Sequence, residues 1–138
     1  MTMAAIADKK IRALFAILST DIHTRGSIVI ASEMRDAGME VIYLGFRQTP
    51  QMVANAAEAE DVDVICLSTH EGFHTQLFPK LVDELKQRGL DIPIVAGGNI
   101  QEQDKTLLES LGVTGNFGQG TPTNVIIDHI KKVAGGTR

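Results

Sequence analysis

Short, continuously apolar runs alternate along this chain with longer segments whose apolar residues recur at helical spacing. The clearest apolar runs cover residues 14–18, 62–68 and 92–98. Strands that are apolar on both faces are typical of a parallel sheet with helices on either side. Five pairs of an apolar run and a helical segment predict an α/β protein. Its expected form is a flavodoxin-like (Rossmann-type), doubly wound, parallel five-stranded sheet in the order 2-1-3-4-5.

Weaker runs and helical segments complete the pattern. Two further strands are expected over residues 41–44 and 113–117. Pro79 lies within the first two turns of a predicted helix, so we expect that helix to begin later than its periodicity indicates, or to kink. The expected helices span residues 26–37, 50–60, 73–88, 101–111 and 122–133.

Composition excludes several classes of protein. Thirteen basic against 17 acidic residues give a net charge of −4, without the basic surface of a nucleic-acid-binding protein. A single cysteine, Cys66, excludes a disulfide framework and a zinc site built from several cysteines. No apolar run approaches the roughly 20 residues of a membrane span, and the N-terminus lacks signal-peptide order. We expect a cytoplasmic domain over residues 11–134, between tails 1–10 and 135–138, without membrane or nucleic-acid partners.

The candidate site residues follow the predicted strands. Ligands of doubly wound sheets bind outside the carboxyl ends of the strands, where these loops converge. Several glycine-containing loops at one edge indicate a ligand more extended than a phosphate, although glycine is also common in such turns without any ligand. The loops contain Asp21, His23, Thr24, Arg25 and Gly26 after the first strand, Ser68, His70 and Gly72 after the third, Gly97 and Gly98 after the fourth, and Gly118, Gly120 and Thr121 after the fifth.

Asp21 and His23 have the spacing of a metal-binding histidine and its supporting carboxylate. A ligating imidazole usually donates its other N–H to a carboxylate, which orients the ring. Asp21 could also be the N-cap of the following helix, beside a surface histidine in a turn. For these two residues taken alone, this simpler interpretation is favoured.

Residues 70–74, His-Glu-Gly-Phe-His, match the H-E-x-x-H pattern of zinc metalloprotease helices. Their context disfavours a zinc hydrolase. His70 is expected in the loop directly after a buried strand and His74 in the first turn of the next helix, with the helix-weakening Gly72 between them. No later segment offers an obvious third ligand.

The order Asp21-x-His23-x-x-Gly26, Ser68 and Gly97-Gly98 resembles the cobalamin-binding domain of mutases and of methionine synthase-type methyltransferases. The family pattern is D-x-H-x-x-G, S-x-L and G-G, and the likeness extends from about residue 11 to 133. It is closest to the small subunit or C-terminal domain of methylmalonyl-CoA mutase-like enzymes. The segments that resemble that branch are residues 35–50, 77–89, 92–98 and 117–122.

The resemblance implies a cofactor, adenosylcobalamin, bound with its own base displaced from cobalt. It implies that His23 is the lower axial cobalt ligand and that Asp21 supports it. Gly26 would place a helix start close to the corrin, and the displaced nucleotide tail would enter a slot beside the sheet. All thirteen loop residues named above are then expected around the cofactor.

Two positions depart from the family pattern. His70 stands where the family has leucine, and the pattern assigns it no role. Ile17 stands where methylmalonyl-CoA mutases often have a lysine, so a hydrogen-bond chain from His23 would stop at Asp21.

The implied function is the small subunit of an adenosylcobalamin-dependent acyl-CoA mutase, a carbon-skeleton isomerase. A (β/α)₈ barrel that binds the acyl-CoA takes roughly 250 residues, so it is expected on a separate large subunit, and this chain alone is expected to be inactive and to carry no catalytic residue. One alternative is a stand-alone corrinoid carrier or sensor, for methyl transfer or cobalamin handling. Methyl carriers usually have a helical module before this domain, and the first strand is expected too early for one. A signalling receiver is disfavoured because Ser68 stands where its phosphorylated aspartate would be.

Overall fold

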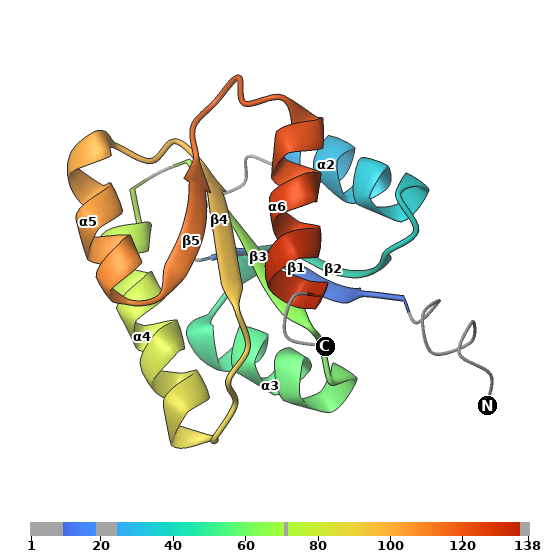
Figure 1. Cartoon of the computed structure of the whole chain (residues 1–138). Coiled ribbons are helices and arrows are strands. Elements are labelled where there is room, and N and C mark those ends of the chain that lie inside the picture. Colours follow the sequence, from blue (N-terminus) through green and yellow to red (C-terminus); the bar gives the residue numbers. More distant parts are fainter. Residues whose placement is uncertain (1–9, 19–24, 71, 136–138) are drawn as a thin grey trace.

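The computed structural model describes residues 10–18, 25–70 and 72–135. Five parallel strands form one sheet in the order β2-β1-β3-β4-β5 (Figure 1), which confirms the predicted flavodoxin-like architecture. The strands are β1 (Arg12–Leu18), β2 (Glu40–Gln48), β3 (Val64–Thr69), β4 (Ile94–Gly98) and β5 (Val113–Phe117). The helices are α2 (Arg25–Asp36), α3 (Pro50–Glu60), α4 (His74–Gln87), α5 (Glu102–Ser110) and α6 (Thr123–Gly135).

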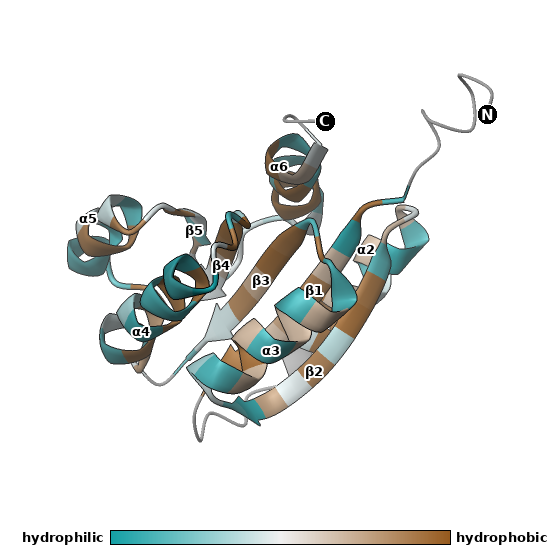
Figure 2. Ribbon diagram, turned by 90° about the horizontal axis from the view of Figure 1, so that it is seen from below, coloured by the Kyte–Doolittle hydropathy of each residue, from teal (hydrophilic) through white to brown (hydrophobic). Residues whose placement is uncertain are grey.

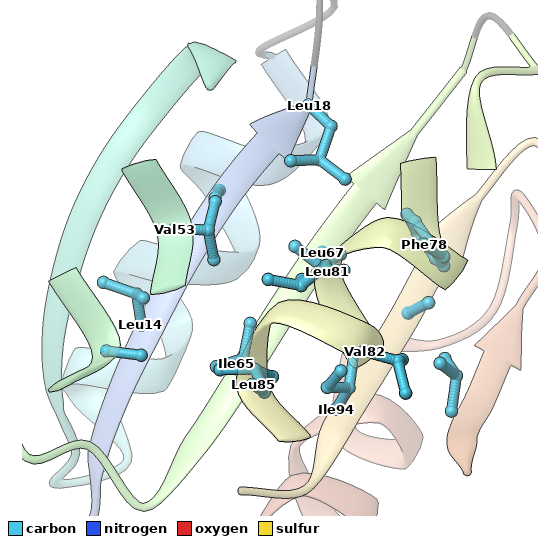
Figure 3. Close-up of a cluster of buried hydrophobic side chains, with 14 of the residues drawn as sticks. Leu14, Leu18, Val53, Ile65, Leu67, Phe78, Leu81, Val82, Leu85 and Ile94 are labelled. Atoms are coloured by element: carbon cyan, nitrogen blue, oxygen red, sulfur yellow. The ribbon is translucent and has the colours of Figure 1, made fainter. Parts of the chain in front are cut away.

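Helices cover both faces of the sheet. Helices α3, α4 and α5 pack on one face, and α2 and α6 pack on the other (Figure 1). Successive residues of β3 alternate between the two cores: Ile65 joins the α3–α5 side, shown in Figure 3, whereas Cys66 joins the α2–α6 side. Both faces of β3 are therefore buried, which explains why it is hydrophobic along most of its length (Figure 2).

Pro79 does not delay the start of α4, which begins at His74 and continues across the proline. A proline inside a helix removes one backbone hydrogen bond and costs about 3 kcal/mol. Phe78, Leu81 and Leu85 from the same helix are almost fully buried against the sheet (Figure 3). Burial of each such side chain stabilises the fold by roughly 1.5–3 kcal/mol, so packing outweighs the cost of the proline.

Strand β2 is the element that the sequence predicts least well, because it runs from Glu40 to Gln48 rather than over residues 41–44. Its pairing with β1 shifts register twice, and Gly45 and Arg47 have φ angles of 80° and 62°. The sequence pattern of a strand stops at these left-handed residues. In the fold the strand continues past them with irregular pairing. Strand β5 has a similar irregularity at Gly115 and Asn116. Every other element begins and ends within two residues of its expected bounds.

The carboxyl ends of β3 and β4 meet in a close backbone contact. The N–H of Asn99 donates to the carbonyl oxygen of Thr69 at 2.7 Å. Gly98 has a φ of 122°, and a Cβ atom there would lie 2.1 Å from the same carbonyl oxygen. Only glycine fits at this position. Gly98 therefore allows the ends of β3 and β4 to lie close together at the edge where the candidate loops converge.

Candidate functional site

A cavity of about 320 Å³ lies at the carboxyl edge of the sheet. Its lining comes from four strands, β1, β3, β4 and β5, from helices α2 and α6, and from the segments that follow β3 and β5. Its volume lies at the lower end of the range for small-molecule pockets. Most of the candidate residues that the structure describes line it: Gly26, Ser68, His70, Gly97, Gly98, Gly118, Gly120 and Thr121.

The remaining candidates are not among the lining residues. Gly72 is exposed, has a φ of 79° and forms part of the turn before α4. Arg25 is the first residue of α2. Asp21, His23 and Thr24 lie outside the described residues. The proposed cobalt ligand therefore stays a prediction, while the neighbouring helix start at Gly26 borders the cavity.

The floor of the cavity consists of apolar residues that the sequence does not single out. They come from the central strands and from α6, and they also belong to the core on that face. Apolar residues of this kind normally indicate packing alone, so only their position in the fold reveals a second role. They include Phe15, Cys66, Val95, Ile126 and Ile130.

Cys66 adds no charge to this floor. The thiol is buried, and burial raises its pKa from the usual value of 9.0 to about 12. Because ionisation is disfavoured in an apolar environment, the thiol is neutral at physiological pH. The floor is therefore suited to an uncharged, apolar part of a ligand.

Two kinds of glycine surround the cavity. A Cβ at Gly97 would lie 3.4 Å from the carbonyl oxygen of Phe117, so internal packing favours glycine there, as it requires glycine at Gly98. In contrast, a Cβ at Gly26 or Gly118 would meet none of the other described residues within 4 Å, apart from the chain neighbours, and neither glycine has a positive φ. Packing among the described residues does not account for these two glycines. The open space in front of them allows a bound molecule to approach the backbone closely.

His70 connects the ends of three strands at the cavity. Its Nε2 lies 3.4 Å from Oγ of Ser68, at the end of β3, and its Nδ1 lies 3.5 Å from Nε2 of Gln119, after β5. The amide of Asn99, after β4, donates to the carbonyl oxygen of His70 at 3.4 Å. Sequence analysis places His70 and the turn that contains Gln119 near the cofactor, but it does not predict that His70 contacts Gln119 or Asn99, which are distant in sequence.

Two other hydroxyl groups on the lining have partners within the protein. Oγ1 of Thr121 donates to the carbonyl oxygen of Gly118 at 2.7 Å, which closes the turn before α6. Oγ of Ser27 lies 2.8 Å from the hydroxyl of Tyr43. These contacts hold the parts of the cavity wall that come from α2 and from the β5–α6 loop.

The second histidine of the H-E-x-x-H match has a structural role. His74 is the first residue of α4, as the sequence predicts, and its side chain is buried. Its Nε2 lies 2.8 Å from Oδ2 of Asp104 and its Nδ1 lies 3.3 Å from Oγ1 of Thr69, so both ring nitrogens are occupied. Within the described part of the chain, no group of three or more His, Cys, Asp or Glu side chains could hold a metal ion. The structure thus offers no support for a zinc hydrolase.

Ile17, at the position of the family lysine, is completely buried and pairs with Ser68 across β1 and β3. This position belongs to the packed interior in this chain.

Among the residues described, none of the helices combines the length and apolar character that a membrane crossing requires.

Known proteins are similar to this chain in sequence and in fold. The small subunit of 2-hydroxyisobutanoyl-CoA mutase from Aquincola tertiaricarbonis is 42% identical over 124 residues, which cover 89% of this chain and 91% of that subunit. Methylmalonyl-CoA mutase of Escherichia coli (strain K12) is 39% identical over 123 residues, which cover 88% of this chain but only 17% of that protein.

A solved structure extends the likeness to three dimensions. A cobalamin-binding protein from Desulfitobacterium hafniense DCB-2 has the same fold, with a TM-score of 0.77 and 19% identity, over 90% of this chain and 59% of that one. The family model described as the B12 binding domain matches residues 11–128. The chain therefore belongs to the B12-binding domain family.

Proposed function

We propose that this chain is the cobalamin-binding small subunit of an adenosylcobalamin-dependent acyl-CoA mutase. The observation that carries the proposal is the similarity to a mutase small subunit along nearly the whole length of both chains. The cavity at the carboxyl edge, with two glycines that internal packing does not explain, supports a large ligand at the expected place.

In this proposal, His23 is the lower axial cobalt ligand and Asp21 holds its imidazole in the correct orientation. Gly26 lets the start of α2 approach the corrin. Bound adenosylcobalamin would supply the radical chemistry of the carbon-skeleton rearrangement.

The described residues bind and orient the nucleotide tail of the cofactor. The apolar floor accepts an aromatic base and excludes water from it, while Gly118 and Gly120 allow the backbone after β5 to lie close to the tail. Ser68 and His70 supply polar contacts at the rim. In this proposal, the small domain binds and orients the cofactor, and it contributes no group that reacts with an acyl-CoA.

The acyl-CoA site lies, in this proposal, on a separate large subunit with a (β/α)₈ barrel. The name of the small-subunit relative implies such a partner, and the matched region is a minor part of the single-chain methylmalonyl-CoA mutase. The choice of acyl-CoA substrate then belongs to the large subunit.

The axial ligand can be tested on the purified chain. Cobalamin is bound anaerobically and reduced to cobalt(II), and the EPR spectrum is recorded with and without ¹⁵N-labelled histidine. We expect the nitrogen hyperfine splitting to change with the label and to be lost in His23→Ala. His129→Ala is the matched control, because His129 contacts Thr114 and does not line the cavity. Failure of the unsubstituted chain to bind cobalamin would overturn the proposed function, whereas a splitting unaffected by the label would overturn only the ligand assignment.

The partner requires a separate experiment. The tagged chain is produced in cells that also make the proposed large subunit, and we expect it to co-purify with that larger, acyl-CoA-binding chain. Mutase activity is expected only when the two chains and adenosylcobalamin are all present. Cobalamin binding without any such partner, together with methyl transfer to a thiol acceptor, would instead identify a corrinoid carrier.

A further inference from the structure

We propose that the contact between His70 and Gln119 is a gate, which lies across the cavity at the carboxyl edge and opens before the nucleotide tail of a corrinoid enters or leaves. We call this contact the His70–Gln119 bridge. The inference rests on the proposed function, since it assumes that the tail binds in this cavity. It assigns a kinetic role to the histidine that stands where the family pattern has leucine.

The bridge joins two strands that are not neighbours in the sheet. Nδ1 of His70, directly after β3, lies 3.5 Å from Nε2 of Gln119, after β5, and β4 lies between these strands (Figure 1). Ser68, Gly97 and Phe117 stand side by side on β3, β4 and β5, and each lines the cavity. The bridge lies two residues beyond this row on both the β3 and the β5 side. It therefore crosses the carboxyl end of β4.

The strand end that the bridge crosses carries no side chains. The last two residues of β4 are Gly97 and Gly98, and both line the cavity. The side chains of His70 and Gln119 also line it, so the bridge faces the same space as the two glycines. A ligand segment that lies against the end of β4 is then enclosed between the glycine backbone and the bridge.

His70 is the fixed half of the bridge. The carbonyl oxygen of the preceding residue, Thr69, accepts from the N–H of Asn99 at 2.7 Å. Oγ1 of Thr69 lies 3.3 Å from Nδ1 of the buried His74. The side-chain amide of Asn99 donates to the carbonyl oxygen of His70 itself at 3.4 Å. The backbone at His70 is therefore tied both to α4 and to the segment after β4.

Gln119 is the movable half of the bridge. It is exposed and lies between two exposed glycines, Gly118 and Gly120. A Cβ at either glycine would meet none of the other described residues within 4 Å, apart from the chain neighbours. Oγ1 of Thr121 donates to the carbonyl oxygen of Gly118 at 2.7 Å, so the turn is closed on itself and moves as a unit. Glycine on both sides and open space suit a segment that opens and closes.

A gate made of the protein's own side chains has a distinct kinetic signature. The bridge contains no ligand atom, so it closes on the free protein and on the complex alike. Opening then costs the same free energy before entry and before release. Both rate constants are slowed by one factor, while the dissociation constant is unaltered. A side chain that bound the ligand directly would instead slow release alone and tighten binding.

The test measures the association and dissociation rate constants of adenosylcobalamin by stopped-flow absorbance. The unsubstituted chain is compared with His70→Leu, with Gln119→Leu and with the double variant. Leucine forms no hydrogen bond, so we expect both rate constants to rise roughly 2- to 10-fold in each single variant, with the dissociation constant changed less than about twofold. Because each substitution breaks the same contact, the double variant should be no faster than either single one.

A conservative variant and two controls isolate the bridge. In His70→Gln the new amide can still meet Gln119, so both rate constants should return toward those of the unsubstituted chain. Adenosylcobinamide, which lacks the nucleotide, should bind and dissociate at the same rates in every variant. Asn124→Leu removes another exposed amide, on α6 and outside the cavity lining, and should leave the rates for adenosylcobalamin unchanged. Circular dichroism and the thermal midpoint verify that each variant is folded.

The outcomes separate the gate from its alternatives. Unchanged rates in both leucine variants overturn the inference while the proposed function stands. Faster release with a proportionally higher dissociation constant also overturns it, because the side chains would then bind the ligand directly. Adenosylcobinamide rates that rise in parallel would show a general loosening of the site and count equally against the gate. Failure of the unsubstituted chain to bind adenosylcobalamin overturns the proposed function itself.

Discussion

Nε2 of His74 lies 2.8 Å from Oδ2 of Asp104, and this pair ties the first residue of α4 to α5. The imidazole also contacts Thr69, so one buried side chain connects the end of β3 with two helices on the same face of the sheet. The loop between Thr69 and His74 carries His70 to the cavity. The hydrogen bonds of His74 therefore hold the end of the loop that carries His70, and His70 lines the cavity.

Loss of the Asp104 carboxylate should destabilise the fold. In Asp104→Ala the buried His74 loses a strong hydrogen-bond partner, and we expect the free energy of unfolding to fall by about 1–3 kcal/mol. Glu102→Ala is the control, because Glu102 is 88% exposed and forms only a surface ion pair with Lys105. That variant should change stability by less than about 1 kcal/mol. Urea unfolding followed by circular dichroism measures the free energy of unfolding of both variants. Equal losses in the two variants would show that the His74–Asp104 contact contributes no more to stability than a surface ion pair.

Alanine at two glycines of the carboxyl edge should separate folding from ligand binding. In Gly98→Ala the new Cβ collides with the Thr69 carbonyl at a left-handed φ, and we expect a loss of at least about 2 kcal/mol in unfolding free energy. In Gly118→Ala the Cβ meets no protein atom, so stability should be nearly unchanged. Cobalamin affinity should nevertheless fall in Gly118→Ala if the backbone there lies against the cofactor. Thermal unfolding and a cobalamin titration of both variants give the answer, and unaltered affinity in Gly118→Ala would contradict a tail-binding role for this turn.

Cys66 should make the fold sensitive to alkali. Because burial raises its pKa from 9.0 to about 12, the unfolded chain loses the thiol proton at a lower pH than the folded one. The stabilisation is fully present below pH 9 and is lost as the pH rises toward 12, at up to about 1.4 kcal/mol per pH unit. Cys66→Ala removes this contribution, so the difference in unfolding free energy between the two proteins should shrink steadily above pH 9. A constant difference from pH 8 to 10.5 would show that the thiol ionises equally in both states.

His129 should titrate below the usual range of histidine. Its pKa is lowered first by partial burial and second by the positive charge of Lys132. The ring also lies 2.9 Å from Oγ1 of Thr114 and stands edge-on to Phe117. A folded pKa below the unfolded value means that this residue's contribution to stability is lost as the pH falls below about 6.5. Lys132→Gln should raise the pKa measured by NMR titration of the ring protons, and a lower value in that variant would refute the electrostatic cause.

The convergence of Ser68, Gly97 and Gly118 at one edge could be predicted from the sequence. Each lies at or just after the carboxyl end of an apolar run, and parallel strands all end at the same side of a doubly wound sheet. The order of the strands follows from the same pattern. For these residues, position along the chain and the topology of the fold are enough to place the site.

The partners of the site residues could not be predicted in this way. His70 meets Gln119 across 49 positions and His74 meets Asp104 across 30, and no local pattern indicates such distant contacts. The floor residue Cys66 has the apolar surroundings of any core position. Contacts of this kind depend on how the helices pack on the sheet, which the periodicity of each segment does not determine.

The irregularities of β2 and β5 have a consequence for how copies of this chain meet one another. These two strands form the edges of the sheet, where regular backbone would offer unpaired N–H and C=O groups to a strand of another molecule. Left-handed residues interrupt both edges, at Gly45 and Arg47 in β2 and at Gly115 and Asn116 in β5. Interrupted edges of this kind hinder strand-to-strand pairing between copies of the same chain, which is the first step of aggregation through sheet edges.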